Sequence, residues 1–430
     1  MSKIKVPYGY GFQSAEINDI INVETIDLIG DEFTENEELM LKNAMDNPIG
    51  SLKLENMVKD DDKVLIVVND HTRPGPNSLI VKETINRLST KILDLKQIKI
   101  IIATGSHRKP TSEELVNILG QDVVNKFEII IHQCKDNDSL VYLGESIYEV
   151  PIYVNKAIVE CTFCIVTGLI APHHSAGFSG GRKSIVPGLA GFETLKIHHS
   201  LPIRPYEPAM GFIYGNPFHE VALDVAKKVN VKFMVNAVQN PHKQNIAFVA
   251  GAIIEAHEKG VDICKDVSEV NISEKADIVI ASPGGYPRDS NLYQAQKALS
   301  VAELLGKPNC TFVLVAECRD GYGEGVLKEW LTLAKDPEDV VERFKNEGYD
   351  VGSNKAFMYA RAMIKGWIIV VSEYLVKDEL EEMMMGWAPN LQEAIDFTLK
   401  KKNPNNILIL PNAVNMIPKI IKGDKNNEKE

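Results

Sequence analysis

The chain has 430 residues, of which 44% are apolar and 25% charged, an ordinary composition for a globular protein. This length exceeds one ordinary hydrophobic core, so two or three domains are expected. The net charge of −12 disfavours nucleic acid and anionic membranes as general partners. We find no signal peptide and no run of the roughly 18 apolar residues that a membrane span needs. Six sparse cysteines are typical of reduced thiols, so a cytoplasmic protein is expected.

Aliphatic runs alternate with amphipathic stretches through the first 270 residues. A capping-box pair, Thr111 and Glu114, marks the start of one helix. The predicted strands lie at 63–69, 98–103, 128–132, 162–170 and 231–238, and the predicted helices at 78–93, from 111, up to 199, at 216–229 and at 253–267. Such alternation predicts a parallel sheet with right-handed crossovers. Cys161 and Cys164 form a CxxC beside the fourth strand, and without a second pair they are expected to be buried thiols.

The rest of the chain repeats this pattern, while residues 1–55 are uninformative. The expected strands are 275–281, 311–316, 367–372 and 407–410, with helices from 291, across 326–346 and 354–364, and at 390–401. The fold class is therefore α/β with two α/β domains. The predicted boundaries are 1–270 for an amino-terminal domain with the glycine loop, 271–405 for a carboxy-terminal domain, and 406–430 for a strand and tail that could return to the first domain.

Three polar loops follow predicted strands of the first domain. Asp70, His107 and His173 each come shortly after a strand ends. Because ligands of parallel sheets bind beyond the carboxyl ends of the strands, these loops should gather at one edge. The pattern predicts a single site there.

A glycine-rich loop follows His173. It contains Gly177, Gly180 and Gly181 and then Arg182 and Lys183. Glycines allow backbone N–H groups to approach an anion, and the two cations add charge. A P-loop requires glycine directly before Lys-Ser/Thr, and Arg182 breaks that spacing. A tight structural turn remains the alternative for the glycines, and a surface or phosphate-binding lysine remains the alternative for Lys183.

Other side chains suit a small polar ligand. Arg73 can bind two oxygens of a carboxylate or phosphate at once. Tyr293 and Lys297, four residues apart, share one helix face beside Gln294. Histidines near strand ends suit proton transfer at neutral pH, but no dense metal-ligand set is present.

Together these motifs resemble the nickel-dependent lactate racemases and related 2-hydroxyacid racemases over nearly the whole chain. The lysine loop is the most specific element of the resemblance. The matching motifs are Asp70-x-Thr-Arg73, Thr104-Gly-x-His107-Arg, His173-x-x-Ala-Gly-Phe-Ser-Gly-Gly-Arg-Lys183-Ser-Ile-x-Pro-Gly188, His199 and Tyr293-Gln294-Ala-x-Lys297.

The resemblance implies two domains with an interdomain active-site cleft and an isomerase that transfers hydride reversibly. Its cofactor would be a nickel pincer nucleotide, pyridinium-3,5-bisthiocarboxylic acid mononucleotide, supplied by maturation proteins. The implied roles are as follows: Lys183 as covalent tether, His199 as nickel ligand, His107 and His173 as acid/base catalysts, Asp70, Arg73, Gly177, Gly180 and Gly181 around the cofactor, and Arg73, Tyr293, Gln294 and Lys297 at the substrate.

One departure concerns the substrate. Lactate-acting members have aromatic residues where this chain has His174-Ser175. The change would enlarge or polarise the pocket, so lactate is the default substrate and a larger hydroxyacid such as malate or an aldonate is the alternative. A non-catalytic nucleotide- or phosphate-binding protein is the alternative of another class. His198 beside His199 leaves a second possible metal ligand, and the oligomeric state is open.

Overall fold

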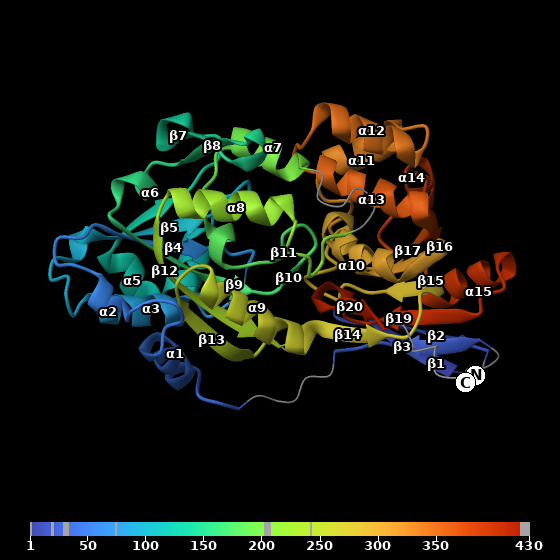
Figure 1. Cartoon of the computed structure of the whole chain (residues 1–430). Helices are drawn as coiled ribbons and strands as arrows, with labels where there is room; N and C mark the ends of the chain where they lie inside the picture. Colours follow the sequence, from blue (N-terminus) through green and yellow to red (C-terminus); the bar gives the residue numbers. More distant parts are fainter. Residues whose placement is uncertain are drawn as a thin grey trace, which may run out of the picture. The chain divides into compact units, whose positions relative to one another are not determined.

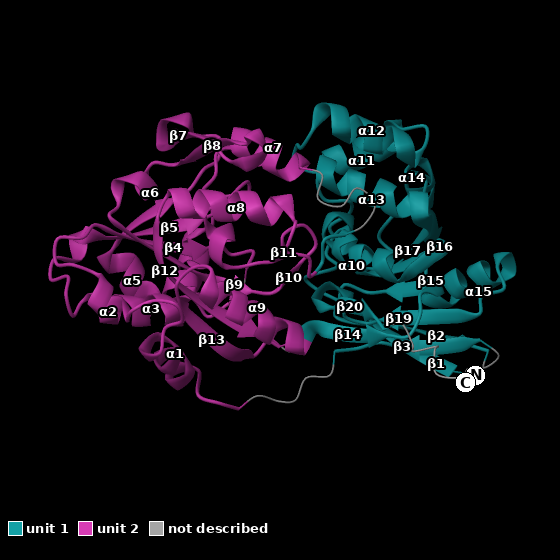
Figure 2. Cartoon of the chain, viewed as in Figure 1, with its two compact units in different colours: residues 1–29, 204–210, 268–430 teal, residues 30–203, 211–267 magenta. Residues whose placement is uncertain are grey.

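The computed structural model describes residues 2–18, 21–28, 34–73, 75–201, 208–240 and 243–421. The chain forms two compact α/β units, coloured separately in Figure 2. Unit 1 comprises residues 1–29, 204–210 and 268–430, and unit 2 comprises residues 30–203 and 211–267. Within the described ranges, no helix is long and apolar enough to cross a membrane.

Unit 2 is built on a six-stranded sheet with the order β13-β12-β9-β4-β5-β6. All neighbours are parallel except β12 and β13, which are antiparallel. Its strands and helices are β4 (Val64–Asn69), β5 (Ile98–Ala103), β6 (Glu128–Ile131), β7 (Leu140–Glu145), β8 (Pro151–Asn155), β9 (Phe163–Ile170), β10 (Pro172–His173), β11 (Gly177–Phe178), β12 (Val231–Gln239), β13 (Asn245–Gly251), α1 (Glu37–Asp46), α2 (Leu54–Met57), α3 (Asn77–Leu88), α4 (Ser112–Leu119), α5 (Gln121–Lys126), α6 (Ala157–Glu160), α7 (Phe192–Ser200), α8 (Pro217–Lys228) and α9 (Glu255–Ser268).

Aliphatic residues explain why these strands are central. β4 is buried from Val64 to Val68, as expected for a parallel strand covered by helices on both faces. Each such side chain contributes about 1.5–3 kcal/mol when it is fully buried. The predicted capping box forms at α4, where the Thr111 hydroxyl accepts from Glu114 N and the Glu114 carboxylate accepts from Thr111 N. Cys164 is buried and Cys161 partly buried, both as free thiols.

Unit 1 has an all-parallel six-stranded sheet with the order β18-β17-β16-β15-β19-β3. Figure 1 shows its elements in colours from yellow and gold through orange to red, joined by blue strands from the amino-terminal part. The strands and helices are β1 (Ser2–Tyr8), β2 (Gly11–Ile17), β3 (Asn22–Thr25), β14 (Glu269–Ile272), β15 (Ala276–Ala281), β16 (Gly306–Val315), β17 (Gly366–Val371), β18 (Gly386–Ala388), β19 (Asn406–Leu410), β20 (Ile417–Ile420), α10 (Leu292–Leu305), α11 (Gly325–Leu333), α12 (Pro337–Glu347), α13 (Ser353–Lys365), α14 (Lys377–Glu382) and α15 (Leu391–Lys401).

The compact units divide the chain differently from the predicted domains. The predicted boundary at 270 lies close to the division at 268, but residues 1–29 belong with the carboxy-terminal half. β3 pairs with β19, and the β1–β2 hairpin places Ile4, Val6 and Ile17 in the same core as the sheet. Residues 406–421 also stay in unit 1, because β19 pairs with β15 and β20 with β14. The predicted tail from 422 lies outside the described residues.

The predicted helical stretch 326–346 is two helices. Asp336 caps α12 by accepting from Asp339 N, and Pro337 occupies its first turn. Proline is favoured there because it needs no hydrogen-bond acceptor.

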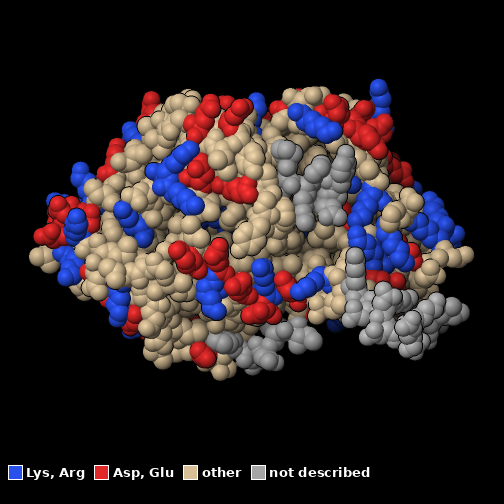
Figure 3. Space-filling view, in the orientation of Figure 1, with Lys and Arg blue, Asp and Glu red and all other residues tan. Residues whose placement is uncertain are grey.

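Charged side chains of both signs are interspersed on the visible face of the protein, as Figure 3 shows.

Candidate active site

The predicted convergence of three loops in unit 2 is confirmed at the level of the sheet. β9, β4 and β5 are adjacent and parallel, so their carboxyl ends lie at one edge. Asp70 follows β4, His107 follows β5, and His173 follows β9. These are the three loops that the sequence marked as one site.

Asp70 and His107 form a hydrogen-bonded pair. His107 Nδ1 lies 2.8 Å from Asp70 Oδ2, and the Asp70 residue is only 2% exposed. Asp70 Oδ1 accepts from Thr72 Oγ1 at 2.7 Å and from Thr72 N at 3.1 Å. Burial raises the pKa of the Asp70 carboxyl, but the bond to His107, the bonds from Thr72 and the charge of Arg73 outweigh it and lower this pKa below its usual range. The carboxylate therefore stays ionised and orients the imidazole.

The lysine loop lies beside His173. A short hairpin pairs His173 with Gly177, and a 3-10 turn over Gly181–Ser184 carries Lys183. Lys183 Nζ is 2.9 Å from His173 Nε2. His173 Nδ1 accepts from the backbone N–H groups of Ser175 and Ala176, each at 3.1 Å. The side chains of His173 and Lys183 therefore contact each other directly.

Packing alone accounts for the three glycines. Gly177, Gly180 and Gly181 are buried and have φ values of +74°, +80° and +53°. A Cβ at Gly180 would lie 2.6 Å from Asn236 Oδ1, and one at Gly177 would lie 2.3 Å from a backbone oxygen. A side chain at either position would clash. Their predicted contact with the cofactor stays a prediction.

Arg182 does not project toward a ligand, contrary to the role of the two cations expected from the sequence. It is 1% exposed, and Nη1 and Nη2 donate to four backbone carbonyls of the loop. Nη1 also lies 2.7 Å from His257 Nε2. Burial lowers the pKa of the guanidinium to about 9 and that of His257 well below its usual range, and His257 Nε2 also lies 3.0 Å from the Ser179 carbonyl oxygen. Arg182 fixes the path of the loop.

The two adjacent histidines of α7 have different environments. His198 is fully buried, with Nε2 donating to the Phe218 carbonyl at 2.9 Å. His199 is partly exposed, and its Nδ1 donates to the Leu195 carbonyl at 3.0 Å. Burial lowers the pKa of His199 to about 3. A neutral imidazole with its lone pair on Nε2 can bind a metal ion, so His199 is the better candidate.

Sequence reasoning missed Phe218, which it placed only within an amphipathic helix. Its ring centroid is 3.8 Å from that of His198, 5.0 Å from His199 and 6.4 Å from His173. Lys183 Nζ lies 5.4 Å from the same centroid. No sequence signal distinguished this phenylalanine from other core residues. It forms an apolar wall against which the histidines and the lysine pack.

Unit 1 carries the predicted substrate residues at the start of α10. Tyr293, Gln294 and Lys297 are partly exposed, whereas the intervening Ala295 and Gln296 are buried. Asn291 caps the helix by accepting from Gln294 N, and Lys297 Nζ donates to Gln294 Oε1 at 2.6 Å. The expected shared face of this helix is present. Whether these residues meet the same ligand as His107 stays a prediction.

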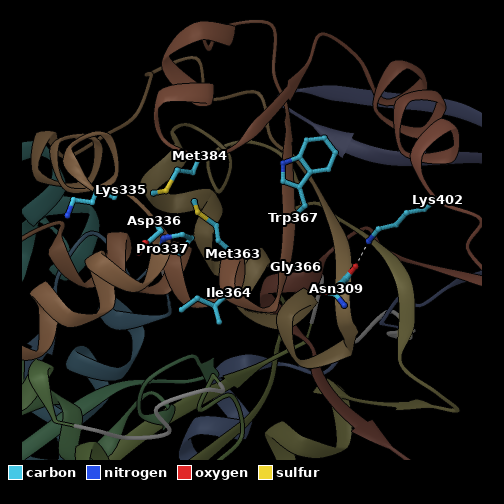
Figure 4. A pocket seen from close by; sticks show the side chains of 10 residues that line it. All are labelled: Asn309, Lys335, Asp336, Pro337, Met363, Ile364, Gly366, Trp367, Met384 and Lys402. Atoms are coloured by element: carbon cyan, nitrogen blue, oxygen red, sulfur yellow. Dashed lines mark hydrogen bonds between the residues drawn. The ribbon is translucent and has the colours of Figure 1, made fainter.

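A separate pocket in unit 1, shown in Figure 4, has a volume of about 530 Å³. Its wall includes Asn309, Gly366 and Trp367, near the amino-terminal ends of β16 and β17. The residues before α10 instead follow the carboxyl end of β15. The pocket is therefore at the opposite edge of the sheet from Tyr293 and contains none of the predicted site residues.

Comparison with known proteins gives the family. Models of the lactate racemase N-terminal and C-terminal domains match residues 8–211 and 271–418. The lactate racemase of Lactiplantibacillus plantarum is 33% identical over 388 residues, which are 89% of this chain and 91% of the relative. The chain belongs to the lactate racemase family.

Other members agree with this assignment over the full length. Lactate racemase of Thermoanaerobacterium thermosaccharolyticum is 31% identical over 425 residues, 97% of this chain and 99% of that protein. The solved structure of its apoprotein matches with a TM-score of 0.89 and 30% identity, covering 97% of this chain and all of the other. A Thermotoga maritima protein, at 17% identity and a TM-score of 0.67 over 90% of this chain and 100% of its own, shares the fold.

The described residues also fit the implied cofactor. Among them, no group of three or more histidine, cysteine or carboxylate side chains could hold a metal ion. His199 offers one neutral imidazole, and Lys183 offers an amine on a rigid loop. An imidazole and an amine of this kind could bind a metal ion and an organic group, respectively.

Proposed function

We propose that this family member is a 2-hydroxyacid racemase, with lactate as the default substrate, that uses a nickel pincer nucleotide attached to Lys183. The observation that carries the proposal is the placement of Lys183 beside His173, at the sheet edge where the Asp70–His107 pair also lies. His199 would be the protein ligand to nickel. Maturation proteins would deliver the cofactor in the cytoplasm.

The reaction explains the need for such a cofactor. Removing the α-hydrogen of a 2-hydroxyacid as a proton would place a carbanion beside an ionised carboxylate. The bound cofactor supplies an acceptor for that hydrogen as hydride. The protein must then take and return the hydroxyl proton, bind the carboxylate and exclude water.

His107 is equipped for the proton step. The ionised Asp70 accepts its Nδ1–H and stabilises the imidazolium that forms when Nε2 takes a proton. His173 would serve the opposite face of the substrate. Arg73, Tyr293, Gln294 and Lys297 would bind the carboxylate, because their donors and positive charges suit two oxygens.

A test of the cofactor uses protein that is co-expressed with maturation enzymes. We expect nickel in stoichiometric amount and an added mass on the peptide that contains Lys183. Lys183→Ala should lose both the mass and racemisation, whereas Lys99→Ala, a matched change at a side chain that is 42% exposed, should keep them. Racemase activity of Lys183→Ala equal to that of the parent would refute the tether.

A larger hydroxyacid is the second candidate, favoured by residues 174 and 175. His174 is partly exposed and stacks on His173, with ring centroids 4.6 Å apart, and Ser175 is buried. A histidine here is more polar than an aromatic residue and suits a substrate with extra polar groups. Polarimetry on lactate, malate and aldonates would rank them. Isotope exchange at the substrate α-carbon separates both candidates from a nucleotide-binding protein without activity.

A further inference from the structure

Nδ1 of His107 faces a hydrogen-bond acceptor, whereas Nδ1 of His173 faces hydrogen-bond donors. His107 Nδ1 faces Asp70 Oδ2 at 2.8 Å and Thr72 Oγ1 at 3.3 Å. The Thr72 hydroxyl donates to Asp70 Oδ1, at 2.7 Å. Because an ionised carboxylate can only accept, His107 must carry a hydrogen on Nδ1. Its Nε2 then has the lone pair.

His173 Nδ1 instead faces two backbone N–H groups, those of Ser175 and Ala176. A backbone N–H can only donate, so His173 Nδ1 must accept. The neutral ring then carries its hydrogen on Nε2. His174 stacks on this ring with an interplanar angle of 14°, which supports its orientation.

We infer that His107 and His173 rest in opposite neutral tautomers, and that His173 is a positioning residue that directs its Nε2–H at an unprotonated Lys183 amine. His107 is thereby the histidine ready to accept a proton. The inference rests on the proposed function only in what the amine is used for, namely attachment of the cofactor.

The direction of the bond between His173 and Lys183 follows from the tautomer. An ammonium group has three hydrogens and no lone pair, so it cannot accept from Nε2–H. A neutral amine can accept, and the 2.9 Å separation then is a normal hydrogen bond. The competing arrangement, an ammonium donating to Nε2, would put a hydrogen on Nδ1 against both backbone donors.

The described residues near Lys183 include several basic groups. Among them are His173 on β10, Arg182 on the same turn, and His198 and His199 on α7. The Arg182 guanidinium repels a second cation, and the histidines are neutral or repel it when protonated.

A neutral amine is what covalent attachment requires, because the nitrogen lone pair is the nucleophile. Thioamide formation from a thiocarboxylic acid joins the lysine nitrogen to the carboxyl carbon and releases its oxygen as water, without a change in oxidation state. His173 would therefore act on Lys183 before it acts on substrate. The same loop geometry would serve maturation first and catalysis afterwards.

The first test is ¹⁵N NMR of the unloaded full chain labelled at histidine, near pH 7. The pyrrole-type and pyridine-type nitrogens of each ring are assigned through single histidine substitutions. His199, whose Nδ1 donates to Leu195 O, and His132, whose Nε2 contacts Ala190 O at 3.0 Å, are internal references for the two tautomers. We expect His107 to match His199 and His173 to match His132. Equal tautomers at His107 and His173 would overturn the inference.

The second test measures the reactivity of the amine. Competitive acetylation of the unloaded protein across pH, followed by mass spectrometry, gives the pKa of each accessible lysine. At pH 7, Lys183 should be acetylated at least ten-fold faster than Lys99, and His173→Gln should slow the acetylation of Lys183 at least ten-fold more than His174→Gln does. Acetylation of Lys183 no faster than that of Lys99 would contradict the inference.

Neither measurement needs cofactor or substrate. A protein without racemase activity could still show both results, and an active racemase could fail both. Lys183→Met provides a further check, because His173 should keep Nε2–H when the two backbone donors alone hold its Nδ1. A change of tautomer in that variant would refute the assignment to the backbone.

Discussion

Replacing Arg182 by methionine should loosen the lysine loop specifically. The guanidinium is buried, and its two terminal nitrogens donate to the carbonyls of Ala176, Phe178, Ser179 and Gly180 at 2.8–3.3 Å. Methionine fills a similar volume but leaves these acceptors without their donor.

The size of the effect follows from these bonds. The two carbonyls that Nη2 serves, at 2.8 and 2.9 Å, have the best geometry. Each buried acceptor left unsatisfied costs about 1–3 kcal/mol. Removing the buried charge also removes its desolvation cost, which offsets part of this loss. We expect a local loss of about 3 kcal/mol, which corresponds to roughly 10²-fold faster opening at 1.4 kcal/mol per factor of ten.

Hydrogen exchange read by mass spectrometry is the suitable assay, because a protein of two compact units need not unfold in one step. Peptides covering residues 171–188 should exchange roughly 10²-fold faster in Arg182→Met. Arg108→Met is the matched control, since the Arg108 side chain is 58% exposed and water screens its ion pair with Glu114. Unchanged exchange in Arg182→Met would refute the proposed clamp.

Three other changes have defined outcomes. Asp70→Asn should reduce racemase kcat by roughly 10²–10⁴-fold. An amide N–H that donates to His107 Nδ1 would move the ring hydrogen to Nε2, so that Nε2 could no longer accept a proton. Steady-state assays measure kcat. Gly180→Ala should destabilise unit 2 by at least about 1–3 kcal/mol, since φ is +80° and the new Cβ would lie 2.6 Å from Asn236 Oδ1; urea unfolding measures it. Burial lowers the pKa of His132 from 6.5 to about 4. Neutral His132 therefore contributes about 3 kcal/mol to the free energy of unfolding above pH 6.5, and this contribution is lost as the pH falls to 4. His132→Gln should reduce the pH dependence of the free energy of unfolding by that amount.

The first two changes each have a control within unit 2. Asp262→Asn, at a side chain that is 69% exposed, should leave kcat unchanged. Gly144→Ala has a similar φ of +87° with nothing within 4 Å of the new Cβ, so its difference from Gly180→Ala isolates the clash. A Gly180→Ala protein no less stable than Gly144→Ala, a fully active Asp70→Asn, or an unchanged pH slope in His132→Gln would contradict the corresponding prediction.

Local patterns predicted the sheet of unit 2 and the edge at which the three polar loops meet. The run from Val64 to Val68 could only be a buried strand, and polar residues after three such runs had to share one edge. The capping box at Thr111 was equally local. These features depend on residues that are neighbours in sequence.

Features that depend on distant partners were missed. The sequence identifies Arg182 as a cation but not that its guanidinium turns inward, because the acceptors become available only when the loop has folded. Phe218 had no signal, and the bond between Asp70 and His107 spans 37 positions. The short strand Asn22–Thr25 has too few apolar residues to reveal its pairing with β19.

That pairing has a consequence for how the protein can be made. Residues 22–25 are translated before the whole of unit 2, whereas their partners, 406–409, are translated after it. The sheet of unit 2 is built from strands within residues 64–251 and can form during synthesis, whereas the sheet of unit 1 is complete only after β19 has been made. A fragment that starts at 271 would lack an edge strand and the hairpin that covers its core, so the carboxy-terminal half should be expressed together with residues 1–28 rather than alone.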